Sequence, residues 1–275
     1  MLRASTQRRI GYSIGALAAF AVLAWMQTGY AQALRRPEFF DGWLLLGGVL
    51  FLTVFNIRKK LSMLPLGNAR VWMRIHIYTG YVVFGIFALH AGLTLPKGAL
   101  DTGLWIVFLF TALSGIAGAY LSKTVPLRLR EAREPVLLER IGYFRRQLAL
   151  ETAEIAARSI EERGSLTIST FYADTLHDFM RRPRNLLGHL RRSNHGLAPI
   201  LAGLDALERY VDDGGRETLG EIRERVMAKH DLDFQYANLM LLRLWLFVHV
   251  PATYGLLVLA AVHVSVVYAF SSGTP

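Results

Sequence analysis

Residues 76–90 read HIYTGYVVFGIFALH, and residues 249–263 read HVPATYGLLVLAAVH. Each stretch begins and ends with histidine, has no charged residue between, and belongs to a longer apolar segment. Histidine is costly in hydrocarbon, so a histidine inside a membrane segment is a functional candidate by default. Two pairs with the same spacing of 14 positions therefore predict two equivalent cofactor sites, stacked across a membrane.

The composition points to an integral membrane protein. Hydrophobic residues make up 53% of the 275 residues and charged residues only 19%, whereas a soluble globular chain carries about 25% charged residues. The chain has no cysteine, which excludes disulfides, thiolate-bound iron–sulfur clusters, covalently attached c-type haem and cysteine nucleophiles. A bound metal or haem must therefore be held by His, Met or carboxylate side chains.

Five apolar segments are long enough to cross about 30 Å of hydrocarbon as α-helices. They cover residues 10–26, 39–57, 71–95, 104–121 and 241–270, and Pro96-Lys97-Gly98 is expected to end the third. The first follows three arginines as a signal peptide does, but it is too long for one and is expected to remain as a helix. The predicted fold class is therefore all-α: a five-span transmembrane helix bundle, with helices one to four in residues 1–121 and the fifth, with a short outer tail, in residues 241–275.

A polar region, residues 122–240, separates the fourth and fifth segments and is predicted to be a helical cytoplasmic insertion. Acidic and basic residues nearly balance in it. Periodicity predicts four helices, over residues 135–163, 169–182, 198–211 and 216–230. Asp231 or Asp233 is expected to cap a further helix that continues into the fifth segment. No dinucleotide-binding or phosphate-loop motif is present in the insertion.

The insertion carries the densest run of basic residues in the chain, Arg181, Arg182, Arg184, Arg191 and Arg192. Such a run is ordinarily solvated or in contact with anionic lipid. The more specific hypothesis is a docking face for an acidic redox partner. The insertion also holds four histidines without metal-ligand spacing, which are expected to be ordinary polar residues: His177, His189, His195 and His230.

Basic residues next to the apolar segments predict the topology by the positive-inside rule. They gather at the N-terminus, between the second and third segments and after the fourth. The N-terminus and the insertion are therefore expected in the cytoplasm, and the C-terminus outside. The net charge of +10 indicates this topology and contact with lipid headgroups, and nucleic acid is not an expected partner. The excess of arginine over lysine is associated with GC-rich bacteria, so the bacterial inner membrane is the expected location.

Helix geometry pairs the four histidines. Fourteen residues of α-helix rise about 21 Å and return to within about 40° of the starting face. Both helices run from inside to outside in the predicted topology, so His76 faces His249 near the cytoplasm, and His90 faces His263 near the outer side. Two facing imidazoles supply both axial ligands of one haem iron. The sequence thus predicts two haem b groups, held by His76/His249 and His90/His263.

This histidine frame resembles that of the di-haem transmembrane b-type cytochromes. That group includes the quinol-oxidising cytochrome b and the membrane domains of ferric reductases and NADPH oxidases. Its members carry two histidines at nearly this spacing on each of two parallel helices, which here take the form His76-x13-His90 and His249-x13-His263. Placement on the third and fifth segments is closer to the ferric-reductase arrangement. The resemblance covers these two helices and implies the cofactor, while the five segments and the long inside loop depart from that arrangement.

Other residues are expected to support the haems. Arg74 and Arg243, with Arg70 nearby, are placed to pair with the propionates of the inner haem, and Lys97 with those of the outer one. Glycines on three segments allow either a flat macrocycle or a neighbouring helix to approach closely. These glycines are Gly47, Gly48, Gly80, Gly85, Gly115 and Gly118.

The predicted function is a di-haem cytochrome subunit that carries electrons across the membrane, as part of an oxidoreductase complex of a respiratory chain. It would connect the quinone pool or a cytoplasmic redox partner with an acceptor or donor on the outer side. Expected partners are membrane lipid, quinone and redox subunits such as a c-type cytochrome, an iron–sulfur protein or a flavoprotein.

Two alternatives remain open. One is a complete quinol-dependent or ferric-type reductase. The other is a haem-free transporter or scaffold whose histidines relay protons or hold helices together. The two histidine-bearing segments contain no Asp or Glu, which argues against an ion transporter.

Overall fold

The computed structural model describes residues 2–32, 37–60, 68–92, 94–130, 134–163, 166–193 and 195–270, and the predicted outer tail after residue 270 lies outside them. Every regular element in these ranges is helical. The chain divides into two compact units, Met1–Tyr120 with Trp245–Pro275, and Leu121–Leu244. The sequence placed the insertion at residues 122–240. Helices α4 and α10 contribute residues to both units.

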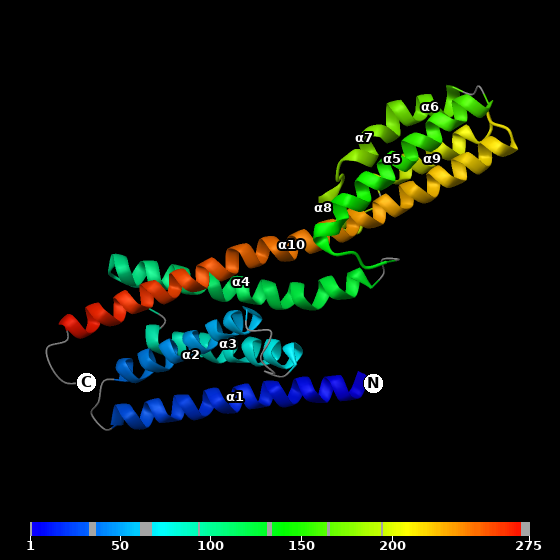
Figure 1. Ribbon diagram of the computed structural model, residues 1–275. Helices are drawn as coiled ribbons and strands as arrows, with labels where there is room; N and C mark the ends of the chain where they lie inside the picture. Colours follow the sequence, from blue (N-terminus) through cyan, green and yellow to red (C-terminus); the bar gives the residue numbers. More distant parts are fainter. Residues whose placement is uncertain are drawn as a thin grey trace. The chain divides into compact units, whose positions relative to one another are not determined.

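The first unit consists of long apolar helices: α1 (Leu2–Gln32), α2 (Pro37–Lys60), α3 (Ala69–Ala91), the greater part of α4 (Ala99–Leu129) and the last part of α10 (Asp213–Phe270). Among the described residues, these five helices are long and apolar enough to cross a membrane. Helices α1, α2 and α3 pack against one another (Figure 1). A buried cluster joins α2, α3, α4 and α10 through Val49, Val83, Phe108 and Leu256.

The ends of two of these helices differ from the sequence prediction. Helix α3 ends at Ala91 because Gly92 adopts a left-handed conformation, with φ of 59°, and its N–H donates to the carbonyl of Leu89. Glycine takes this conformation at little cost and commonly ends helices in this way. The prediction that Pro96-Lys97-Gly98 ends this helix was therefore wrong. Helix α4 continues beyond residue 121 to Leu129.

The second unit packs short helices around α5 (Leu138–Arg163) and the first part of α10. The short elements are α6 (Leu166–Phe171), the π-helical turn η1 (Tyr172–Leu176), α7 (His177–Arg181), α8 (Leu186–Leu190) and α9 (Ala198–Leu207). Residues 169–182, predicted as one helix, thus belong to three elements. The core of this unit includes the fully buried side chains of Leu176, Met180, Leu204, Leu219 and Val226.

Helix α10 runs without interruption from Asp213 to Phe270, so the predicted cap at Asp231 or Asp233 was wrong. The carboxylate of Asp233 is buried and accepts hydrogen bonds from Nζ of Lys229 at 2.6 Å and from the backbone N–H of Arg184 at 3.1 Å. Lys229 lies four residues before it, one helical turn away, on the same face. An aspartate paired in this way can sit inside a helix, so it does not mark a helix start.

One histidine of the second unit is not the ordinary polar residue that the sequence predicted. His189 is only 3% exposed, and its ring lies 4.6 Å from that of His230, centroid to centroid. Burial, and to a smaller extent the neighbouring His230, lower the pKa of His189 to about 4. His189 is therefore neutral at pH 7, and the charged form is excluded by the core around it.

Candidate functional site

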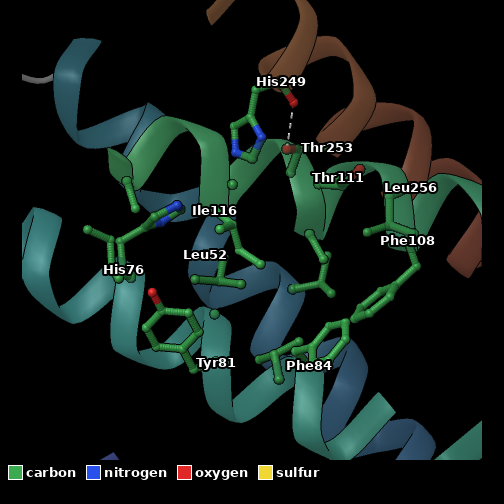
Figure 2. A pocket seen from close by; sticks show the side chains of 17 residues that line it. Leu52, His76, Tyr81, Phe84, Phe108, Thr111, Ile116, His249, Thr253 and Leu256 are labelled. Carbon is green, nitrogen blue, oxygen red and sulfur yellow. Dashed lines mark hydrogen bonds between the residues drawn. The ribbon is translucent and has the colours of Figure 1, made fainter. Parts of the chain in front are cut away.

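His76 on α3 and His249 on α10 line one cavity, named here the inner cavity (Figure 2). Figure 2 shows both imidazole rings pointing towards this space. About 840 Å³ of it is free of protein atoms, counting the part that opens to the surroundings. Apart from the two histidines, its polar side chains are two threonines and one tyrosine, and the rest of the lining is apolar, including Leu52, Phe84, Phe108 and Leu256.

The hydrogen bonds of His249 select one tautomer of its ring. Oγ of Ser114 lies 2.7 Å from Nδ1 of His249 and also donates to the carbonyl of Thr111 at 2.8 Å. A serine hydroxyl has one proton, so when that proton is on the Thr111 carbonyl, Nδ1 of His249 is the donor to Ser114. Nε2 is then the nitrogen that carries the lone pair, as a metal ligand requires.

Trp245 holds the same ring from a second side. Its indole stacks on His249 with centroids 5.2 Å apart and an angle of 23° between the planes. The indole N–H donates to the carbonyl of Ser114 at 2.8 Å. Trp245 and Ser114 therefore fix the orientation of His249 together, as the supporting residues of a metal-binding histidine do.

The glycines highlighted in the sequence have two different roles. Gly48, Gly85 and Gly118 lie directly against the side chains of Val83, Phe20 and Trp245, so they allow close helix packing. Gly80 and Gly115 line the inner cavity instead. A Cβ on Gly115 would lie 3.6 Å from Cε1 of His249, and one on Gly80 would meet nothing within 4 Å. These two glycines keep the space beside the histidines open.

His90 on α3 and His263 on α10 line a separate cavity, named here the outer cavity, at the other end of the same helices. About 480 Å³ of it is free of protein atoms on the same measure. Its wall includes the carboxylate residue Glu38 and the aromatic residues Phe39, Trp43 and Tyr268. The indole N–H of Trp43 donates to the hydroxyl of Tyr268 at 3.0 Å, which joins α2 to α10 beside this cavity.

A carboxylate supports His263 in the outer cavity. Nδ1 of His263 lies 3.1 Å from Oδ1 of Asp101. A carboxylate is an acceptor only, so Nδ1 carries the proton and Nε2 is again the nitrogen with the lone pair. On the opposite wall, a Cβ on Gly42 would lie 3.4 Å from Cε1 of His90. Nδ1 of His90 is buried and has no hydrogen-bond partner among the described residues.

Helix α4 thus supplies a partner to each histidine of α10. Ser114 serves His249 and Asp101 serves His263. The partners lie 13 residues apart on α4, close to the 14 residues between the histidines, and their order is reversed because the two helices run antiparallel. Sequence reasoning did not identify either partner. The signal was a pair of polar residues at nearly the histidine spacing, Ser114 on the fourth predicted segment and Asp101 just before it.

Asp41 is a further residue that sequence reasoning missed. It lies in α2, within the second predicted segment, and is only 2% exposed. Nε2 of Gln27 donates to its Oδ2 at 2.6 Å. It directly precedes Gly42, the residue beside His90. The apolar segments are therefore not free of carboxylates, and the outer cavity has acidic residues around it that the inner cavity lacks.

The predicted arginines are not part of the described linings of the two cavities. The guanidinium of Arg74 lies 6.0 Å from the centroid of the Tyr12 ring, and Arg243 is exposed and belongs to the second unit. Neither is among the described residues that line the inner or the outer cavity. Their pairing with haem propionates stays a prediction.

In the part of the chain that the structure describes, no three His, Asp or Glu side chains come together as a metal site. Each cavity therefore offers two imidazoles to a metal. Comparison with protein-family models, with curated proteins and with solved structures finds no match for this chain.

Proposed function

We propose that the chain is an integral membrane cytochrome that holds two b-type haems and passes electrons between them across the membrane. His76 and His249 would ligate the inner haem, and His90 and His263 the outer one. The observation that carries this proposal is the arrangement of the two equally spaced pairs. Helices α3 and α10 each contribute one histidine to each of two separate cavities.

The membrane location is supported by the helices of the first unit. Five helices of the described residues are long and apolar enough to span a bilayer, and helices satisfy their own backbone hydrogen bonds there. Large apolar side chains are exposed on their outer faces, among them Trp25 at 75% and Phe247 at 78%. Exposed apolar surface of this kind favours contact with lipid. An orientation with the N-terminus in the cytoplasm agrees with the positive-inside rule.

The residues of both cavities suit haem. Haem brings four ring nitrogens to its iron and supplies one-electron chemistry when bound, so the protein provides only axial ligands. Ser114 and Asp101 hold the Nδ1 protons of His249 and His263, which leaves Nε2 to face a metal. Gly80 and Gly115 keep the inner cavity open to a flat group. The apolar lining excludes water and favours a neutral macrocycle.

The spacing of the pairs suits transfer between two centres. Histidines 14 residues apart on one helix are separated by about 21 Å, so the two pairs cannot share one ion. A haem at each of these two levels would divide the path of an electron across the membrane into shorter transfers. The chain would then be an electron-transfer subunit of a membrane oxidoreductase complex. Its donor would be quinol or a redox subunit such as a flavoprotein, an iron–sulfur protein or a c-type cytochrome.

A haem-free proton relay is the second candidate, and the outer cavity favours it. Asp101 contacts His263, Glu38 lines the same cavity, and Asp41 is buried on α2 next to Gly42. Alternating carboxylates and imidazoles form proton pathways in membrane proteins. The inner cavity has no carboxylate among its lining residues, so a relay would lack a continuation there.

The deciding experiment is a dithionite-reduced minus oxidised visible spectrum of the purified chain, with haem quantified per chain. We expect two haems with the bands of low-spin b-type centres. A folded protein that contains no haem would refute the cytochrome and leave the proton relay. Far-ultraviolet circular dichroism of the same sample shows whether the protein is folded.

A further inference from the structure

The second unit contains a cleft that the proposed function does not use. It lies between α5 and α7, which pack together (Figure 1). About 1130 Å³ of it is free of protein atoms, counting the open part. We name it the arginine cleft, and its lining is Gly142, Arg145, Arg146, Ala149, Leu150, Ala153, Tyr172, His177 and Arg181.

The polar side chains of the arginine cleft are cationic or neutral. Three guanidinium groups line it, from Arg145, Arg146 and Arg181, and no Asp or Glu is among its lining residues. Arginine stays protonated at any physiological pH. Three positive charges that converge on one cleft repel one another unless an anion joins them. The charge of the cleft therefore favours a ligand with more than one negative charge.

Arg145 has an unused donor at this place. Its Nη1 is buried and has no hydrogen-bond partner among the described residues. The same guanidinium lies 5.8 Å from the centroid of the Tyr236 ring. A buried donor without an acceptor costs free energy, so turning Nη1 towards an anion in the cleft would remove that cost.

Two neutral groups complete the polar wall. Nε2 of His177 lies 3.3 Å from Nη1 of Arg181, so it accepts a hydrogen bond from the guanidinium. The ring proton is then on Nδ1, which lies 3.5 Å from Oδ1 of Asp178. Burial raises the pKa of Tyr172, and Arg181 lowers it by less, so the phenol stays protonated and can donate. Tyr172 begins the π-helical turn η1 and His177 directly follows it, and their rings meet edge to face at 6.1 Å. Single π-helical turns occur frequently at functional sites.

We propose that the arginine cleft binds an organic phosphate. The guanidinium groups would hold the phosphate oxygens, because their paired N–H groups match phosphate geometry. A phosphate monoester has three terminal oxygens and up to two negative charges, which suits three guanidiniums and a phenol better than a carboxylate does. The Ala149, Leu150 and Ala153 side chains beside them offer an apolar wall to the organic part. A soluble phosphate ester and a phospholipid headgroup share this chemistry.

The test uses the full-length chain and two probes. Phenyl phosphate is titrated by calorimetry into the chain in phosphatidylcholine nanodiscs. Separately, retention of phosphatidic acid by the detergent-purified chain is measured by native mass spectrometry. The variants are Arg181→Ala, and Arg182→Ala as the matched control. Arg182 is the next residue and is also exposed, but it does not line the cleft, so both variants lose one surface charge.

We expect Arg181→Ala to weaken binding about tenfold, or about 1.4 kcal/mol, and Arg182→Ala to leave it unchanged. Loss of phenyl phosphate binding identifies a soluble ester as the ligand. Loss of phosphatidic acid retention alone identifies a lipid headgroup. The proposal is overturned if neither probe binds, or if both variants weaken binding equally. Haem content of the same samples is independent of these results, so failure here leaves the proposed function standing.

Discussion

The inner and outer cavities share their ligand helices but differ in what surrounds the histidines. His249 is held by the neutral hydroxyl of Ser114 in an apolar cavity. His263 is held by the carboxylate of Asp101, in a cavity that Glu38 also lines. The two cavities therefore have the same histidine spacing but differ in the charge of the groups around the histidines. In the proposed cytochrome the histidines would determine where a metal binds, and residues of α2 and α4 would determine the charge around it.

This difference has a consequence for the proposed cytochrome. A nearby carboxylate stabilises the more positive, oxidised form of a metal centre, and hydrogen bonds to the ligands tune its potential. We therefore expect the outer haem to have the lower reduction potential. The inner haem would then be the more readily reduced of the two.

Removing one ligand from each pair tests whether the two sites are separate, and has the largest expected effect. His249→Ala and His263→Ala should each lower the haem content from two per chain to one, because each cavity loses one of its two imidazoles. The pyridine haemochrome assay gives the count. His189→Ala is the control, since His189 is in the core of the second unit. Unchanged haem in both ligand variants would show that these histidines are not the ligands.

Filling one cavity is a gentler way to separate the sites. Gly115→Leu places a side chain beside His249, so we expect it to reduce inner haem and leave the outer haem in place, with up to half of the total lost. Gly47→Leu is the control, because an added Cβ there meets nothing within 4 Å and Gly47 does not line either cavity. Equal haem loss in the two variants would argue against a cofactor beside Gly115.

His189 differs from the four paired histidines because it is buried in the protein core of the second unit and is not a proposed ligand. Its pKa is lowered to about 4 by burial and by His230, against about 6.5 in the unfolded chain. The unfolded state therefore binds more protons between these values, and stability falls as pH drops from about 6.5 to about 4, by roughly 3 kcal/mol. Thermal unfolding followed by circular dichroism across this range measures it. His189→Gln should make the stability less dependent on pH in this range. An equally strong pH dependence in the variant would show that other groups cause it.

Neutralising the carboxylate that contacts His263 has the smallest expected effect and tests the electrostatic difference between the cavities most directly. Asp101→Asn removes a charge 3.1 Å from Nδ1 of His263, so the outer potential should rise by about 60 mV, a tenfold change for one electron. Ser114→Ala should alter only the inner potential, because its hydroxyl contacts His249. Spectroelectrochemical titration resolves the two. A shift of both potentials by the same amount in Asp101→Asn would contradict the local effect.

Much of the first unit follows from local sequence. Apolar runs of sufficient length predicted the helices, since length and composition alone decide whether a helix can span a bilayer. Local pattern was less informative at the helix ends, where Gly92 stops α3 and no residue stops α10 near Asp233. In the second case a buried pairing with Lys229 satisfies the aspartate, and a sequence window does not reveal that pairing.

By itself, the sequence determined that His76 and His90 share one helix face, and likewise His249 and His263, because helical rise and turn are constant along a chain. Only the tertiary structure decided which residues support them. Ser114 and Asp101 reach the histidines because α4 lies antiparallel to α10 in a particular register. The same arrangement decides that Gly118 packs against Trp245 while Gly115 borders a cavity. Such roles depend on which helix is the neighbour and on how each helix is rotated about its axis. The periodicity of a single helix does not give this information.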